Sequence, residues 1–201
     1  MSFREKYARV ARHYETLERP LDRFFCPLRK RAISFIEGKK VLEVGIGVGK
    51  TLKYYPKDIE LCGVDAVPET LKLAEKKAGR MNLKACFQVA DVENLPFTDS
   101  TFDTVVSSFV FCTVPEMEKG LAEIRRVLKP GGRAIFLEHT RSDSKLVDYF
   151  FLLPMKLILK PLLDDDPLRN THELVDRFFE PELVESYYRG VVRLIVARKP
   201  G

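Results

Sequence analysis

The fold is decided by the stretch Val41-Leu42-Glu43-Val44-Gly45-Ile46-Gly47-Val48-Gly49, in which a β-rich run leads into three closely spaced glycines. Glycine has no Cβ, so such a loop lets the backbone approach a ligand closely. The glycines are spaced as GxGxG after an acidic residue, whereas a dinucleotide-binding loop typically reads GxGxxG. The loop predicts a nucleotide-like site after the first strand. The alternative is a tight strand-helix turn that binds nothing.

On both sides of this loop, short β-rich runs alternate with runs of helical periodicity. The β-rich runs lie at 40–44, 61–64, 85–89, 104–109 and 133–138, and the helical runs between them lie at 68–78 and 115–128. Two helical patterns at 3–18 and 21–35 come first, and a helix at 171–179 and a hairpin of 183–188 and 191–198 come last. This alternation is typical of an α/β fold with a parallel sheet covered by helices on both faces.

The composition suits one ordinary domain over residues 1–201, because 45% of the residues are hydrophobic. The net charge of +5 is concentrated in the first forty residues, where eleven Lys and Arg face five Asp and Glu. That segment can attract phosphate on lipid headgroups or nucleic acid, or it can be a solvated helix face. No secretory leader opens the chain and no apolar stretch reaches about 18 residues, so a cytoplasmic location is expected.

Four cysteines, Cys26, Cys62, Cys86 and Cys112, are scattered along the chain without a CxxC pair. Their neighbours are mostly apolar, which favours small buried side chains in a reducing compartment. A disulfide or a metal site is the less favoured alternative, and no metal is expected.

Two acidic positions follow predicted strands. Asp65 ends the second strand about 20 residues beyond the glycines, where a carboxylate can accept hydrogen bonds from both hydroxyls of a ribose. Its alternative roles are a solvated turn or the cap of the next helix. Asp91, after the third strand, can accept a hydrogen bond from an adenine amino group, and Val92 can offer its backbone N–H to the ring. The later run Arg126-Val127-Leu128-Lys129-Pro130-Gly131-Gly132 is interpreted as a structural turn.

Together, VLEVGIGVG, GVD, DVENLPF, TFDTVV and RVLKPGG resemble the class I S-adenosylmethionine-dependent methyltransferases in order and spacing. The resemblance covers nearly the whole chain and implies a Rossmann-like, seven-stranded sheet of order 3-2-1-4-5-7-6 with the last strand antiparallel. It implies an enzyme that uses S-adenosylmethionine. The implied cofactor contacts are Glu43, Gly45, Ile46, Gly47 and Gly49 at the glycine loop, Asp65 and Ala66 at the ribose, Asp91 and Val92 at the adenine, and Ser107 and Ser108 at the methionine amino end.

Three subfamilies give closer resemblances. Tyr7-Ala8-Arg9, Tyr14-Glu15 and the glycine-loop segment resemble small bacterial phosphatidylethanolamine N-methyltransferases. The stretch from Phe111 to His139 resembles membrane-associated thiol methyltransferases, and quinone-biosynthesis C-methyltransferases share the general plan. All three subfamilies act on lipid-like or hydrophobic acceptors. The resemblance therefore implies a hydrophobic small-molecule acceptor.

An apolar segment at 146–163 points the same way. It is too apolar for an ordinary surface helix, and too short and interrupted to span a bilayer. Within the predicted apolar and helical insertion at 145–180, it can be an interfacial element or a lid over the acceptor site. With the helical cap at 1–38, it can dock on an anionic membrane at its inner face. The alternative is that both segments simply cover the sheet.

Methyl transfer is an in-line displacement, so the enzyme chiefly supplies alignment and exclusion of water. Tyr14, through its match to the subfamily's opening motif, is the candidate for covering the cofactor and shaping the acceptor site. His139, just past the fifth strand, is the best-placed candidate base. A purely structural histidine is the alternative there.

Other classes of function are less well matched. A Rossmann dehydrogenase is disfavoured by the glycine spacing and the Asp91 motif. A noncatalytic adenosylmethionine-binding module would bind the cofactor's product and transfer nothing, and methylation of a soluble metabolite is a further alternative. Nucleic-acid methylation is disfavoured because the chain has no base-flipping motif and no appended recognition domain.

Overall fold

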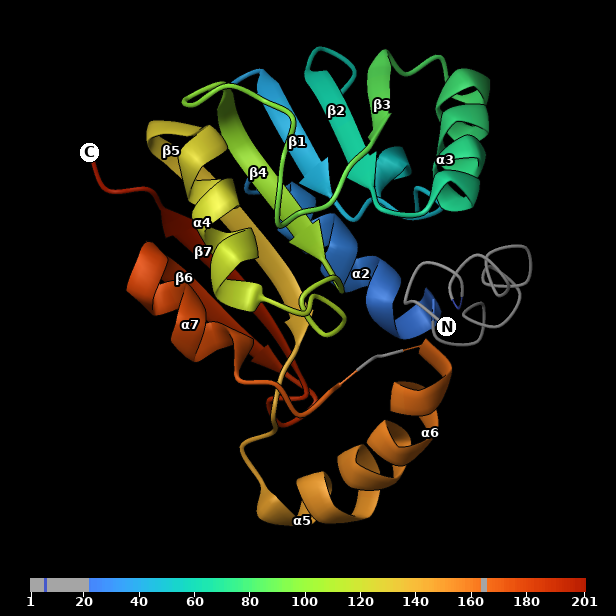
Figure 1. Cartoon of the computed structure of the whole chain (residues 1–201), viewed down its shortest axis with the longest axis vertical. Helices are drawn as coiled ribbons and strands as arrows, with labels where there is room; N and C mark the ends of the chain where they lie inside the picture. Colours follow the sequence, from blue (N-terminus) through green and yellow to red (C-terminus); the bar gives the residue numbers. More distant parts are fainter. Residues whose placement is uncertain (1–5, 7–21, 164–165) are drawn as a thin grey trace.

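A seven-stranded sheet forms the centre of the computed structural model, which describes residue 6 and residues 22–163 and 166–201. The strands are β1 (Lys40–Val44), β2 (Glu60–Asp65), β3 (Ala85–Val89), β4 (Phe102–Ser108), β5 (Leu128–His139), β6 (Glu180–Tyr187) and β7 (Val192–Arg198). Their order is β3-β2-β1-β4-β5-β7-β6 (Figure 1), with β7 antiparallel to β5 and β6 and the other neighbours parallel. The expected fold class and strand order are confirmed.

Helices cover both faces of the sheet. One face carries α2 (Asp22–Ile33), α3 (Pro68–Arg80) and the short helix η2 (Leu52–Tyr54); the other carries α4 (Met117–Val127) and α7 (Thr171–Phe178). Along β1, Val41 packs into the first of these cores, and Leu42 and Val44 pack into the second. Because successive strand side chains point to opposite faces, a run of apolar residues buries both sides of a parallel sheet.

The predicted turn before β5 is the main error in the strand bounds. β5 begins at Leu128, directly after α4, rather than at residue 133. The pairing with β4 jumps from Leu128 opposite Phe102 to Arg133 opposite Thr104, so the intervening residues form an irregularity within the strand. Gly131 permits this irregularity because its φ of 70° lies in the left-handed region.

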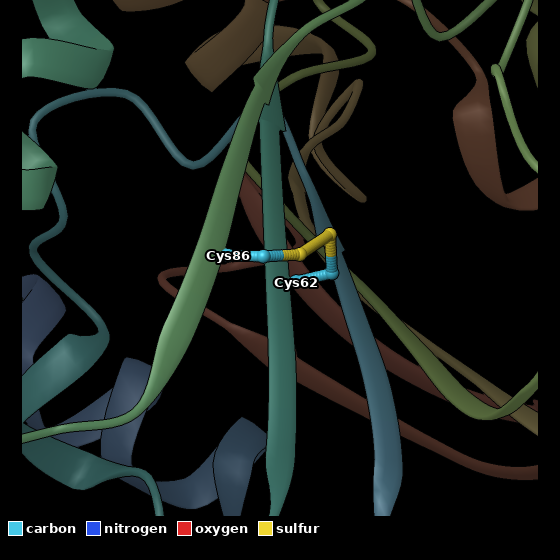
Figure 2. The surroundings of a disulfide bond; sticks show 2 residues. All are labelled: Cys62 and Cys86. Carbon is cyan, nitrogen blue, oxygen red and sulfur yellow. A yellow bond between two sulfur atoms is a disulfide. The ribbon is translucent and has the colours of Figure 1, made fainter.

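The prediction for the cysteines is wrong at two of the four positions. Cys62 of β2 and Cys86 of β3 are joined by a disulfide between neighbouring strands (Figure 2). The parallel register sets the two residues directly opposite each other, with their Cα atoms 4.6 Å apart. Cys112 is buried and Cys26 is partly buried, and neither is in a disulfide. The cysteines therefore give no argument for a reducing compartment.

The predicted insertion at 145–180 divides into two parts. Residues 145–163, named here the apolar arm, comprise α5 (Lys145–Val147), the π-helical turn η3 (Asp148–Leu152) and α6 (Leu153–Leu163). The arm lies beyond the carboxyl ends of β4 and β5 (Figure 1). By contrast, α7 packs on the sheet through the fully buried Val175. Of the predicted cap at 1–38, α2 covers the sheet, and the helix expected at 3–18 lies outside the described residues except for residue 6.

Candidate cofactor site

A cavity of about 320 Å³ lies at the carboxyl edge of β1, β2 and β4. The loops that follow these strands form its walls, which is the usual place for a ligand in an open α/β sheet. The predicted cofactor residues that line it are Glu43, Gly45, Ile46, Gly47, Asp65, Ala66, Asp91, Val92 and Ser108. The structure thus brings together all the predicted cofactor residues except Gly49 and Ser107.

The glycine loop needs glycine for different reasons at different positions. Gly45 and Gly47 have φ values of 62° and 54°, in the left-handed region that other residues rarely adopt. A Cβ on Gly47 would meet only the Gly45 carbonyl oxygen, at 4.0 Å, so this position leaves open space on the cavity wall. A Cβ on Gly49 would instead overlap Leu52 of η2. Gly49 therefore serves the packing of the loop rather than the cavity.

Glu43 is a buried carboxylate held by its own loop. Thr51 donates its hydroxyl to both carboxylate oxygens at 2.8 and 2.7 Å, and Tyr55 donates its hydroxyl to Oε2 at 3.0 Å. Burial raises the pKa of Glu43 to about 7, although these hydrogen bonds and the nearby Arg29 oppose the shift. The side chain thus joins β1 to the segment after the glycines and puts a titratable group on the cavity wall.

Asp65 connects the two loops that would flank a ribose. Its Oδ2 accepts a hydrogen bond from the backbone N–H of Gly47 at 2.8 Å. Its Oδ1 accepts hydrogen bonds from the Val67 N–H at 2.9 Å and the Thr70 hydroxyl at 3.1 Å. Burial raises the pKa of Asp65, and these three donors partly oppose that effect. Asp65 is not the cap of the next helix, because α3 begins at Pro68 with Val67 as its N-cap residue; the carboxylate instead contacts Val67 and Thr70 at that end of the helix.

The two serines at the end of β4 have different surroundings. The Ser108 hydroxyl is buried on the cavity wall and has no hydrogen-bond partner among the described residues, as expected of a group that awaits a ligand. Ser107 is fully buried and donates to Glu138 Oε1 at 2.6 Å, away from the cavity. Glu138 also accepts the Val110 and Phe111 N–H groups, at 2.9 and 3.1 Å, and so shapes the loop that follows β4.

Asp91 and Val92, which follow β3, lie next to each other on the cavity wall. The Asp91 carboxylate accepts a hydrogen bond from the Glu93 N–H at 3.0 Å, which closes a tight turn after β3. Val92 is buried beside it. Both residues that the family resemblance assigns to the adenine thus line the cavity.

Arg29 is a cavity residue that sequence reasoning missed. Its side chain comes from α2, lines the cavity and is only 5% exposed, in a segment whose basic residues suggest a solvated face. The guanidinium carbon lies 5.2 Å from the Phe109 ring centroid, within cation–π range. The cavity therefore contains a buried positive charge as well as the carboxylates of Glu43 and Asp65.

Of the two predicted catalytic residues, only His139 lies within the described residues, and it is not part of the cavity wall. Tyr14 lies outside the described residues. His139 packs against Phe109, with ring centroids 4.7 Å apart, and against Phe25 at 5.7 Å. Phe109 itself lines the cavity, so the imidazole lies behind that ring. Within the described ranges, no group of three or more His, Cys, Asp or Glu side chains is placed to hold a metal ion.

Relatives of known type share both the motifs and the fold. Residues 42–136 match the family described as "Methyltransferase domain". A demethylmenaquinone methyltransferase of Deinococcus radiodurans is 35% identical over 162 residues, which cover 77% of this chain and 67% of that protein. A ubiquinone/menaquinone biosynthesis C-methyltransferase, UbiE, of Geotalea daltonii is 32% identical over 172 residues, with coverages of 77% and 72%. A phosphatidylethanolamine N-methyltransferase of Cereibacter sphaeroides is 35% identical over 120 residues, with coverages of 58% and 59%.

Solved structures of other proteins share the fold of this chain. A SAM-dependent methyltransferase of Thermotoga maritima superposes with a TM-score of 0.72 at 21% identity and covers 98% of this chain and 100% of its own. The YcgJ protein of Bacillus subtilis gives a TM-score of 0.69 at 19% identity, with coverages of 88% and 98%. The strand order, the glycine loop, the acidic residues around one cavity and these relatives lead to one conclusion. The chain belongs to the class I S-adenosylmethionine-dependent methyltransferases.

Proposed function

We propose that the acceptor of this methyltransferase is a hydrophobic, lipid-like molecule: a quinone precursor, a phospholipid amine or a hydrophobic thiol. The observation that carries the proposal is the apolar arm, whose outward side chains are exposed and which is followed by Asp166, bonded to the loop after β4. The names of the relatives support it, because they include quinone, phosphatidylethanolamine and thiol methyltransferases.

The residues of the cavity suit S-adenosylmethionine. Asp65 would accept hydrogen bonds from the ribose hydroxyls, the free Ser108 hydroxyl would bind the amino end of the methionine, and Arg29 would pair with its carboxylate. The bound cofactor supplies a methyl group on a positively charged sulfur. The protein's own part is to align the two reactants and to exclude water, and orientation can lower such a barrier by several kcal/mol.

The loop after β4 forms a mostly apolar wall of the cavity, as a hydrophobic acceptor requires. Phe109, Val110, Val114 and Pro115 line it together with Thr113, whose hydroxyl donates to the Val110 carbonyl at 2.8 Å. Apolar groups of an acceptor would therefore lose contact with water without leaving a polar group of this wall unpaired.

Replacing Arg29 with leucine is expected to weaken binding of S-adenosylhomocysteine about fivefold to tenfold, the loss of one charge-assisted hydrogen bond in a partly hydrated site. The affinity for 5′-methylthioadenosine, which lacks the amino-acid end, should stay within about twofold, because that ligand carries no carboxylate. Calorimetric titration measures both affinities. Lys30→Leu, at the exposed neighbouring position, is the control. An equal loss for both ligands would show that Arg29 supports the cavity's shape and does not bind the carboxylate.

The acceptor class is tested with matched pairs that differ only in their hydrophobic portion. Demethylmenaquinone is compared with the naphthoquinone nucleus alone, phosphatidylethanolamine with glycerophosphoethanolamine, and a long-chain thiol with mercaptoethanol, all in the same detergent. We expect the tailed member of one pair to be methylated with a kcat/KM at least about tenfold above its short partner, since each buried methylene adds about 0.8 kcal/mol. Preference for a short member, or equal rates within the active pair, would contradict the proposal.

A further inference from the structure

The apolar arm has hydrophobic side chains on its outer side as well as its inner side. Inward, Leu152 is fully buried, with Val147 and Met155 packed near it in the core. The exposed hydrophobic side chains are Leu146, Tyr149, Phe150, Phe151, Leu153, Leu157 and Ile158, with Phe150 exposed by 72% and Leu157 by 69%. A surface helix ordinarily has a polar outer side, and a contiguous exposed apolar patch marks an interaction site.

Polar contacts near the start of the arm and in α6 hold the arm in place, so its exposed apolar side chains face away from the rest of the protein. At the start, Asp148 accepts hydrogen bonds from the Ser142 N–H at 3.0 Å, the Ser142 hydroxyl at 2.6 Å and Arg141 Nε at 3.0 Å. In α6, Lys156 Nζ lies 2.8 Å from Asp166 Oδ2. The exposed apolar side chains therefore lie on a segment held by polar contacts, and they take no part in those contacts.

The segment that begins at Asp166, after the arm, is hydrogen-bonded to the loop that follows β4. The backbone N–H of Asp166 donates to the Cys112 carbonyl at 3.0 Å. The Arg169 guanidinium donates to the carbonyls of Phe111, at 3.0 Å, and Val114. Val114 lines the cavity, so the segment that follows the arm contacts the cavity wall.

The charges along the arm favour an anionic surface. Its charged residues are Lys145, Asp148, Lys156 and Lys160, and Asp148 is turned inward and 9% exposed. Lys156 and Lys160 lie 2.8 and 3.5 Å from the same Asp166 oxygen, so two lysines share one carboxylate, while the side chain of Lys160 stays 57% exposed and Lys145 is exposed. An exposed side that combines Phe, Tyr and Leu with lysines is typical of helices that lie in the headgroup region of a membrane.

We propose that the apolar arm docks the enzyme on the surface of a membrane with anionic headgroups, its outward side chains entering the interface. No described helix is long and apolar enough to cross a membrane, so the arm would lie along the surface. The benefit of docking for catalysis rests on the proposed hydrophobic acceptor, which the membrane would present to the enzyme. Docking itself does not depend on the acceptor and is measured without it.

The absence of tryptophan from the chain allows a direct test of insertion. Phe150→Trp introduces one tryptophan on the arm, and Val184→Trp introduces one at an exposed apolar position of β6, away from the arm. With phosphatidylcholine vesicles that contain phosphatidylglycerol, we expect a blue shift of the Phe150→Trp emission and quenching by brominated acyl chains. The Val184→Trp emission should not change. Equal behaviour of the two variants would overturn the proposal.

The energetic contribution of the arm is measured by vesicle sedimentation of the full chain. The double variant Phe150→Ser/Leu157→Ser is expected to lower the partition coefficient at least about tenfold, and Lys145→Gln about fivefold, with further weakening in high salt. Val184→Ser is the matched control and should bind as the wild type does. All of these changes are at exposed positions, and retained binding of S-adenosylhomocysteine confirms that each variant is folded.

Two further results would overturn the docking proposal. One is an absence of sedimentation with anionic vesicles at low salt. The other is a blue shift of Phe150→Trp without vesicles that grows with protein concentration as a dimer forms, which would make the patch a contact between copies of the chain. Methyl transfer to a tailed acceptor in detergent distinguishes these failures from failure of the proposed function, since the double variant should retain that activity if only docking is lost.

Discussion

Replacing Asp65 with alanine is expected to weaken binding of S-adenosylhomocysteine by about tenfold to a hundredfold. A charge-assisted hydrogen bond contributes roughly 1.5 to 3 kcal/mol, and this carboxylate can accept one from each ribose hydroxyl. The carboxylate also accepts the Gly47 N–H at 2.8 Å and the Val67 N–H at 2.9 Å, so its loss loosens both loops that border the cavity. Calorimetric titration of S-adenosylhomocysteine into the folded variant measures the effect.

The control for this prediction is Glu69→Ala, which removes an exposed carboxylate from the first turn of the same helix, α3. It should leave the affinity within about twofold, because a solvated carboxylate away from the cavity interacts weakly with a bound ligand. Unchanged affinity in a folded Asp65→Ala variant would remove Asp65 from the cofactor site.

Replacing Glu43 with glutamine is expected to change how stability depends on pH. Burial raises the pKa of Glu43 from an ordinary value of 4.5 to about 7. Because this acid ionises less readily in the folded protein, the wild type loses stability as the pH rises from about 4.5 to 7, and the loss stays constant above that. The difference of about 2.5 in pKa corresponds to about 3 kcal/mol in the free energy of unfolding. Glutamine cannot ionise, so its variant avoids this loss.

Urea unfolding without ligand, at pH 5 and at pH 8, measures this effect. At pH 5 the folded wild type holds Glu43 as a neutral carboxyl, which like the amide has one carbonyl oxygen for Thr51 or Tyr55, so the two proteins should have similar stability. Between pH 5 and pH 8 the variant should gain about 2 to 3 kcal/mol relative to the wild type. Glu69→Gln, at an exposed position of α3, should show no such trend. A stability difference that does not vary with pH would mean that Glu43 keeps an ordinary pKa in the folded protein.

Much of the sheet could be predicted because its strands carry strong local signals. The bounds predicted for β1 and β3 agree with the structure, since each is a short β-rich run flanked by charged, glycine or polar residues. The final hairpin turns where predicted, at Gly190, whose φ is 85°. The start of β5 could not be predicted, because Lys129-Pro130-Gly131-Gly132 is a turn signal by composition. It became part of a strand only through pairing with its neighbours.

The cofactor site was predictable where motif position alone determines the location, as for Asp65 and the glycine loop. The predictions for the other cavity residues failed where only the tertiary structure determines which way a side chain points. Ser107 and Ser108 are consecutive, so they point to opposite faces of β4, and only the packing shows which one faces the cavity. Arg29 carries no motif, and the placement of α2 against the sheet turns its side chain inward.

The disulfide and the exposure of the arm also could not be predicted from the sequence alone. Cys62 and Cys86 have no motif spacing, and their contact depends on the register between β2 and β3. The sequence identified residues 146–163 as unusually apolar, but exposure of Phe150 and Leu157 on the outer side is a property of the folded arm. Hydrophobicity alone does not distinguish a covering helix from one that awaits a partner.

Methyl transfer from S-adenosylmethionine to a hydrophobic acceptor can be followed directly in a cell extract. The purified chain is incubated with S-adenosylmethionine labelled on the methyl group and a total cell extract, and the products are partitioned between organic and aqueous phases. We predict label in the organic phase, at a level that falls with Asp65→Ala, and chromatography of that phase then identifies the acceptor. Label confined to the aqueous phase would contradict a hydrophobic acceptor and would direct the search to soluble metabolites, nucleic acid or protein.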